Sequence, residues 1–250
     1  MNFNTLLAFD IETIPDAKHH TGSKFPKVLF HEVIAVSFVE VGLKFRDGLE
    51  LHELNDIRSG GEASFTEAQL LDGFFKYVER KKPRLVTFNG RSFDLPVLKY
   101  RAMLHGISSP WLNQGESRFE NYGYRYSPHW HCDLMDVLAD FGASTSAKLD
   151  EVSRLFGFPG KFGIDGSKVA AIFADGGIED IRHYCETDAL NTYLVYLRYA
   201  LFRGEIDRAG YNNTISAILT YIDAHGGNRA HLNEFKQAWR EASGDAFLLE

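Results

Sequence analysis

The stretch LLAFDIETIPD, Leu6 to Asp16, predicts a buried β-strand that carries acids at alternate positions. Side chains at i and i+2 of a strand point to the same face, so Asp10 and Glu12 lie about 7 Å apart along that face. Burying two like charges is costly unless something compensates them. Either the two carboxylates lie at an exposed strand end, or a cation lies between them.

Length and composition indicate an ordinary globular chain. The 250 residues suit one large domain, or one domain with an appendage. No stretch approaches the roughly 20 apolar residues that a membrane-spanning helix needs, and the first residues, MNFNTLLAFD, lack the basic segment of a signal peptide. Cys132 and Cys185 have no metal-binding spacing. We therefore expect a cytoplasmic protein without a membrane partner.

The net charge of −7 argues against a protein that holds nucleic acid by bulk electrostatics. It does not exclude an enzyme that acts on nucleic acid. Carboxylates that bind divalent cations add to the formal negative charge, yet the cations present positive charge to a phosphate.

Hydrophobic periodicity predicts a mixed sheet followed by helices. Strands are expected at 33–41, 48–54 and 84–90, with a hairpin between the first two. A capping box of Ser64 and Glu67 is expected to open a helix that ends near Lys82. Later helical patterns are DLPVLKYRAMLHG, DLMDVLADFG, KLDEVSRLFGF, SKVAAIFADG, residues 179–202 and two segments after residue 205. This order predicts an α/β fold with a mostly helical second half.

Two more acids stand where the chain can bring them to the first pair. Asp94, in FNGRSFDLP, follows a predicted strand where the chain turns into a helix. Asp188, in HYCETDALNTYLVYL, lies on the apolar stripe of its helix, where a carboxylate is expensive unless it is compensated. Tyr184 lies four residues earlier and shares a helix face with Asp188.

The segments FDIETIP, FNGRSFD and YCETD, in this order, resemble the three motifs of the DEDD superfamily of 3′–5′ exonucleases. The closest similarity is to the predicted exonuclease group related to the proofreading domain of family B DNA polymerases. HCDLMDVL and KLDEVSRLFGFPGK are also similar to that group. The resemblance implies a ribonuclease-H-like fold and an exonuclease domain over residues 1–204. The helices of 205–250 carry no matched motif. We expect them to form a C-terminal extension packed on the same domain, and the alternative is that they dock a partner.

The same resemblance implies a site for two divalent cations, Mg²⁺ or Mn²⁺, about 3.5–4 Å apart. Asp10 would bridge both ions, Glu12 and Asp188 would complete one site, and Asp94 would hold the other ion. Tyr184 would orient the attacking water. A phenol with a pKa near 10 positions a water more readily than it deprotonates one.

Four residues next to the motifs are candidates for substrate contact. Thr13 and Ile14 follow the first motif, where relatives line the pocket of the 3′-terminal nucleotide. Asn89 and Phe93 fit the second motif, where such residues contact substrate. The alternatives are that Ile14 and Phe93 are packing residues and that Asn89 only forms a turn.

The segment HYCETD fits both branches of the superfamily, which differ in a tyrosine four residues or a histidine five residues before the last acid. His183 would be the better general base. The flanking segments DIETIP and NGRSFD resemble the tyrosine branch, which favours Tyr184.

Other patterns leave alternatives open. Asp94 is also a suitable N-cap, and Asp188 could pair with Arg182 or another base. The aromatic segment 119–130, with Arg118 and Arg125, could stack unpaired bases or belong to the core. Lys148, Lys161 and Lys168 are candidates for phosphate contact by position alone. We interpret His129 and His131 as structural.

The sequence therefore predicts a metal-dependent 3′–5′ exonuclease that releases nucleoside 5′-monophosphates from single-stranded DNA by a two-metal-ion mechanism. A replication or repair protein is the expected partner. The alternatives are an exoribonuclease of the same fold, or a catalytically idle module that binds nucleic acid.

Overall fold

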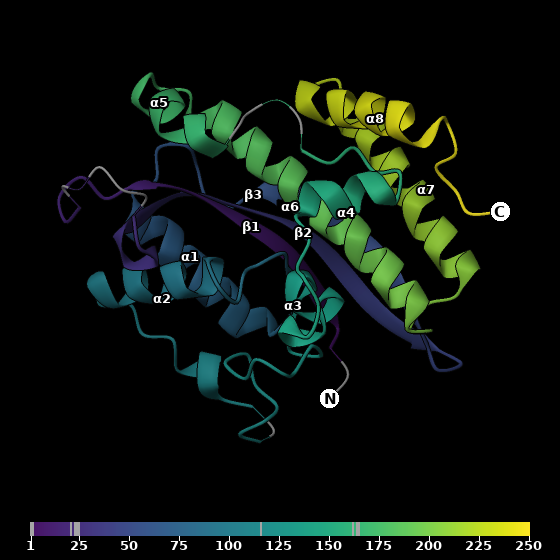
Figure 1. Ribbon diagram of the computed structural model, residues 1–250, viewed down its shortest axis with the longest axis horizontal. Coiled ribbons are helices and arrows are strands. Elements are labelled where there is room, and N and C mark those ends of the chain that lie inside the picture. Colours follow the sequence, from purple (N-terminus) through teal and green to yellow (C-terminus); the bar gives the residue numbers. More distant parts are fainter. Residues whose placement is uncertain (1–2, 21, 23–25, 116, 162, 164–165) are drawn as a thin grey trace.

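A five-stranded mixed sheet forms the centre of the molecule in the computed structural model, which describes residues 3–20, 22, 26–115, 117–161, 163 and 166–250 (Figure 1). The strand order is β3-β2-β1-β4-β5. The strands are β1 (Thr5–Pro15), β2 (His31–Arg46), β3 (Leu49–Ser59), β4 (Arg84–Thr87) and β5 (His131–Asp133). β1, β2 and β3 pair antiparallel, whereas β4 pairs parallel with β1 and with β5. The predicted α/β, ribonuclease-H-like fold is confirmed.

The hairpin of β2 and β3 turns at Asp47 and Gly48, whose φ angles of 55° and 83° suit a tight two-residue turn. Both strands are longer than their sequence patterns predict. β5 has no counterpart in the prediction, because three residues are too few to show a period.

Helices cover both faces of the sheet. α1 (Glu67–Lys81) and α2 (Asp94–Leu104) lie on one side, and α6 (Ile178–Phe202) crosses the other (Figure 1). α7 (Arg208–His225) packs against β3 beside α6, and α8 (Ala230–Ser243) packs against α6 and α7. The shorter helices are α3 (Leu134–Leu138), α4 (Leu149–Leu155), α5 (Val169–Ala174), η1 (Val28–Phe30), η2 (Pro110–Asn113), η3 (Asp140–Gly142) and η4 (Gly166–Lys168).

The start of α1 differs from the prediction. Its capping box is made by Thr66 and Gln69, not by Ser64 and Glu67. Thr66 has the extended backbone that an N-cap requires, directly before the first helical residue. Glu67 is instead buried, where it accepts the Val33 N–H at 2.7 Å and pairs with Arg101.

The helix that the pattern DLMDVLADFG predicts is shorter than expected. α3 ends at Leu138, because Asp140 and Phe141 take left-handed φ angles of 46° and 54°. Residues with a side chain rarely adopt this conformation, and a helix cannot continue through it.

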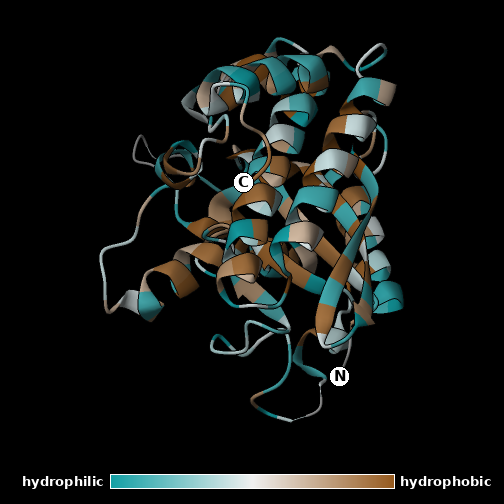
Figure 2. Ribbon diagram, turned by 90° about the vertical axis from the view of Figure 1, so that its right-hand side faces the viewer, coloured by the Kyte–Doolittle hydropathy of each residue, from teal (hydrophilic) through white to brown (hydrophobic). Residues whose placement is uncertain are grey.

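The C-terminal helices share the core of the sheet. Hydrophobic ribbon is concentrated in the middle of the molecule, where helices meet strands (Figure 2). Buried side chains of α7 and α8 belong to the same hydrophobic cluster as the sheet: Tyr211, Ile215, Ile218, Ile222, Leu232, Phe235 and Trp239. Within the described part of the chain, no helix combines the length and apolar character that crossing a membrane requires.

Candidate active site

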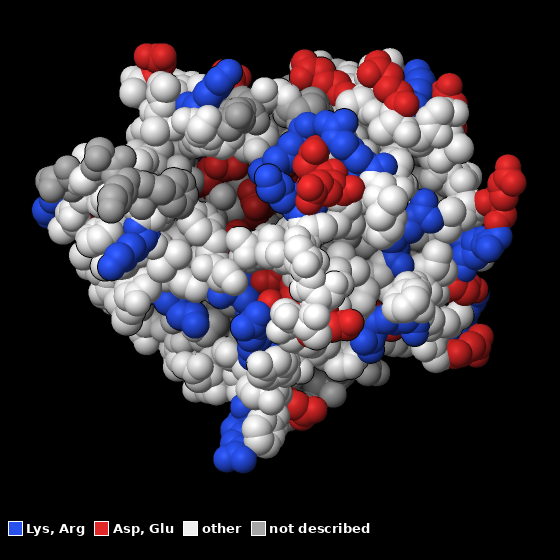
Figure 3. Space-filling model, viewed as in Figure 1, with Lys and Arg blue, Asp and Glu red and all other residues white. Residues whose placement is uncertain are grey.

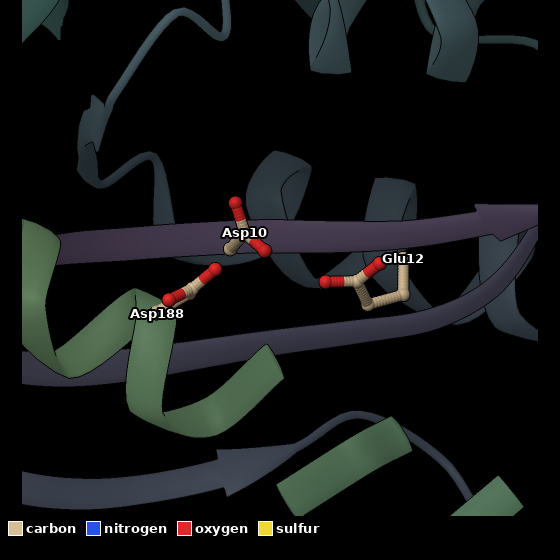
Figure 4. Close-up of side chains that lie close together, drawn as sticks. All are labelled: Asp10, Glu12 and Asp188. Atoms are coloured by element: carbon tan, nitrogen blue, oxygen red, sulfur yellow. The ribbon is translucent and has the colours of Figure 1, made fainter. Parts of the chain in front are cut away.

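Three acids converge between β1 and α6. Asp10 and Glu12 lie on the face of β1 that α6 covers, and Asp188 points to them from α6 (Figure 4). One carboxylate oxygen of each residue lies within 4.8 Å of the others. The pairing of β1 with β2 shifts between Glu12 and Thr13, and such a bulge re-aims the side chains next to it.

The fourth acid, Asp94, follows a tight turn after β4; it lies outside the 4.8 Å group but close enough for its charge to act on Asp10 and Glu12. Gly90 allows this turn, because a Cβ there would lie 2.4 Å from the Thr87 hydroxyl oxygen. Asn89 takes a left-handed φ of 69°, and its N–H donates to the Asp133 carboxylate at 2.8 Å. Asp94 is the first helical residue of α2 and Phe93 is the cap, so the N-cap interpretation of Asp94 is wrong.

Burial disfavours charge on all four acids, and mutual repulsion adds to this for Asp10 and Glu12. Burial, followed by the charges of Asp94, Asp188 and Glu12, raises the pKa of Asp10 well above its ordinary value. Burial and the charge of Asp188 raise the pKa of Glu12 to about 8. Burial raises the pKa of Asp94 to about 7, and it also raises the pKa of Asp188. Four such carboxylates need positive charge nearby.

Lys161 supplies one positive charge. Its ammonium group lies 2.9 Å from Asp188 Oδ2 and donates to the Tyr184 hydroxyl oxygen at 3.0 Å. Burial alone would lower the pKa of Lys161, but Asp188 and Tyr184 raise it. Asp188 therefore pairs with a basic residue, and that residue is Lys161. Arg182 is not the partner, because its guanidinium donates to the carbonyls of Gly60 and Gly61.

The backbone holds Lys161 in this position. The Lys161 N–H donates to Asp150 Oδ1 at 2.8 Å, and the Gly160 carbonyl accepts from the Asn191 amide at 2.8 Å. Gly160 has a φ of 70°, and a Cβ there would lie 2.5 Å from Asp150 Oδ1. The loop is thus tied to both α4 and α6.

The cluster fits divalent cations. The other oxygen of Asp188, Oδ1, is buried and has no hydrogen-bond partner among the described residues. Hard cations bind through carboxylate oxygens, and an unpartnered buried carboxylate oxygen beside two further acids is the kind of ligand they use. Figure 3 shows a hollow with an acidic floor on this face of the molecule, with Lys or Arg side chains beside it.

Tyr184 faces this cluster and His183 does not. Burial and the charge of Asp188 raise the pKa of Tyr184, so its phenol stays protonated at neutral pH. His183 instead stacks on His231 of α8, with ring centroids 4.0 Å apart. Burial also lowers the pKa of His183.

Two of the four candidate substrate residues, Thr13 and Phe93, lie around a histidine that the sequence did not single out. The Thr13 hydroxyl is 2.9 Å from His31 Nδ1, and the His31 ring meets the Phe93 ring edge to face at 5.0 Å. Ile14 packs against the small apolar cluster of α5 and α6, and Asn89 is held by Asp133. No sequence signal pointed to His31, because a single polar residue beside an apolar strand resembles a surface position.

Fold and acidic cluster together define a nuclease of the ribonuclease-H-like class. Residues 23–239 match the family described as a predicted 3′–5′ exonuclease related to the exonuclease domain of PolB. The chain belongs to this family, and it is an enzyme of the exonuclease class. Exonuclease domains of this type depend on metal ions.

Curated relatives are DNA polymerases. A DNA polymerase of Pyrococcus glycovorans is 30% identical over 197 residues, which cover 75% of this chain and 24% of the polymerase. A catalytic polypeptide of DNA polymerase epsilon from Schizosaccharomyces pombe is 26% identical over 216 residues, covering 78% of this chain and 9% of that polypeptide. The chain thus spans about a quarter or less of the length of these relatives.

Proposed function

We propose that the protein removes nucleotides from the 3′ end of single-stranded DNA with the help of two divalent cations, Mg²⁺ or Mn²⁺. The observation that carries this proposal is the convergence of Asp10, Glu12 and Asp188 within 4.8 Å, with Asp94 beside them. The preference for DNA rests on the relatives, which are named DNA polymerases.

Each acid has a role that follows from its position. Asp10, on which the charges of the other three acids act, would be the ligand that the two cations share; Glu12 and Asp188 would hold one cation and Asp94 the other. Two such ions stabilise the charge on the attacking and leaving oxygens of a phosphodiester displacement. Tyr184, as a neutral phenol, orients the attacking water.

We also propose how the rest of the chain contributes. Thr13, Ile14, Asn89 and Phe93 receive the terminal nucleotide at the end of the cluster where His31 joins Thr13 to Phe93. Residues 1–204 form the exonuclease unit and residues 205–250 an extension that packs on it. Glu186 of α6 supports the packing of the extension, because it pairs with Arg229 and His231 at the start of α8. A replication or repair protein is the proposed partner.

A 5′-labelled single-stranded DNA oligomer tests this function. We expect a ladder that shortens one nucleotide at a time with Mn²⁺ or Mg²⁺ and is absent with EDTA. A matched RNA oligomer tests the sugar preference, since a 2′-hydroxyl can be read or excluded at the terminal sugar. Faster digestion of the RNA would assign the protein to the exoribonuclease alternative. Binding without cleavage of either strand would support the idle module.

Tyr184→Phe is expected to lower the single-turnover rate by about 10²-fold, because the water loses its orienting hydroxyl. His183→Ala is the matched comparison and should retain nearly the full rate, since His183 stacks on His231 away from the acids. The rates should be measured at saturating Mn²⁺, with Mn²⁺ affinity measured separately. The opposite pattern would assign the site to the histidine branch.

Lys161→Met is expected to tighten Mn²⁺ binding by roughly tenfold, because the ammonium competes with the cation for Asp188. The same change should lower the melting temperature in EDTA at pH 8, where Lys161 offsets the acids. Lys168→Met, at an exposed position of η4, is the control for loss of one positive charge. Calorimetric titration measures the affinity, and weaker Mn²⁺ binding by Lys161→Met would contradict this role.

A further inference from the structure

The aromatic segment between β4 and α3 divides into a buried and an exposed part. Trp111, Tyr122 and Trp130 are buried and meet edge to face, with centroids 5.4 and 5.0 Å apart. Phe119 and Tyr126 are 48% and 56% exposed. The segment thus contributes to the core and also leaves large rings at the surface.

The two exposed rings belong to a continuous series with two partly exposed rings. Phe119, Tyr124, Tyr126 and Phe141, named here the aromatic row, follow one another with centroid distances of 5.2, 5.7 and 5.0 Å. Phe141 takes part although its φ of 54° is left-handed, a conformation that bulky side chains avoid and that is found at functional sites. The row extends from the loop at the lower end of Figure 1 to η3, next to α3.

Positive charge accompanies the row. The Arg118 guanidinium lies 4.4 Å from the centre of the Phe119 ring. Arg125 pairs with Asp136 at 2.5 Å but is still half exposed. Figure 3 shows Lys and Arg side chains over this face between the acidic hollow and the lower end of the molecule. Aromatic rings interleaved with basic side chains are the surface on which single-stranded nucleic acids stack.

The row is also tied to the acidic cluster. The Arg91 guanidinium donates to the carbonyls of Tyr122 and Tyr124 at 2.6 and 2.9 Å. The Arg91 N–H donates to the Asp133 carboxylate, which also accepts the Asn89 N–H. Arg91 lies three residues before Asp94. Hydrogen bonds of Arg91 and Asp133 therefore connect the loop of the aromatic row with the turn that precedes Asp94.

We propose that the aromatic row binds the unpaired nucleotides upstream of the 3′ end that enters the acidic cluster. This inference rests on the proposed function, and it assigns the row to a single strand of nucleic acid. Bases stack on the exposed rings, and Arg118 and Arg125 contact the phosphates. The row thereby offsets the repulsion that a chain of net charge −7 exerts on nucleic acid.

Length-dependent binding tests the row without hydrolysis. Fluorescence anisotropy in EDTA would compare oligothymidylates of about sixteen and roughly three nucleotides, a range that spans known single-strand site sizes. We expect wild type to bind the long strand more tightly, and F119A/Y126A to lose about 10- to 100-fold of that affinity. Y126F should retain the affinity, because it keeps the ring. F202A, which removes an 86% exposed ring at the end of α6, is the matched control and should bind as wild type.

Each outcome bears on the row separately from the exonuclease. Melting temperatures of F119A/Y126A and wild type should agree, because exposed side chains contribute little to stability. Unchanged long-strand affinity in F119A/Y126A, or an equal loss in F202A, would overturn the proposal even if wild type digests DNA. An equal loss for the short strand would also overturn it, because the rings would then act at the 3′ end itself. F119A/Y126A could lose the length dependence of binding while wild type cleaves neither DNA nor RNA. That result would support binding by the aromatic row and would reject the proposed exonuclease activity.

Discussion

Asp10→Asn is expected to abolish hydrolysis and, at the same time, to raise the melting temperature of the metal-free protein. Asp10 faces Asp94, Asp188 and Glu12, and these charges together with burial raise its pKa. An amide in its place removes one repelling charge, which stabilises the fold in EDTA at pH 8. It also removes the carboxylate that, in the proposed function, the two cations share. Cations of this kind contribute several kcal/mol to transition-state stabilisation, so the rate should fall by about 10³-fold or more.

The opposite signs of the two effects make this experiment specific. A residue that only supports the fold would lose activity and stability together. Asp180→Asn is the matched control, because it removes an exposed acid from the same helix that carries Asp188. It should change neither the single-turnover rate nor the melting temperature appreciably. An Asp10→Asn protein that keeps more than about a tenth of the rate would contradict the assignment of Asp10 as shared ligand.

The acids could be placed from the sequence because their signals are local. Asp10 and Glu12 share a strand face by a spacing of two, and Tyr184 and Asp188 share a helix face by a spacing of four. The turn FNGRSFD brings Asp94 to the same edge once the strand order is known. Short-range geometry therefore predicts most of the cluster, and the three motifs supply its long-range assembly.

The positions of Lys161 and His31 could not be predicted from local sequence patterns. Lys161 reaches Asp188 from a loop that has no period, and its position depends on contacts of Asp150 and Asn191 that no spacing encodes. His31 lies before an apolar strand, where a single polar residue resembles a surface position. Only the packing of β2 against α2 places it between Thr13 and Phe93.

Local sequence signals also fail to predict which side chains of the aromatic segment are buried. Tyr122 is buried and Tyr124 is partly exposed, although the two residues have the same chemistry and nearly the same position. A strand would place both side chains on one face, and a helix would place them on opposite sides, but an irregular loop has no period that decides between these arrangements. Their environments follow from tertiary contacts alone, such as the Tyr122 hydroxyl donating to the Pro83 carbonyl at 2.7 Å.

Without metal ions, the contribution of the acidic cluster to the stability of the protein should fall as the pH rises from about 4 to about 8. The pKa of Glu12 is raised from 4.5 to about 8, and that of Asp94 from 3.8 to about 7. The folded protein therefore binds more protons than the unfolded chain across this window. Stability decreases with pH wherever the folded state binds more protons, so the contribution of these acids is full below their ordinary pKa values and is lost above the raised ones. Lys161 moderates the effect, because its charge lowers the pKa of both acids.

Divalent cations should reverse this loss, and they should do so more strongly at pH 8 than at pH 6. Cations bind the deprotonated carboxylates, so at pH 6 binding must first release protons from Glu12 and Asp94. At about 100 times its Kd, one bound ion adds about 2.7 kcal/mol, which corresponds to a rise in melting temperature of about 5–10 °C for a chain of this size. Comparing the melting temperature with Mn²⁺ and with EDTA at each pH cancels titrations elsewhere in the protein. The Asp10→Asn variant should lose most of the gain, and a gain in wild type that is equal at both pH values would show that the cation binds outside the acidic cluster.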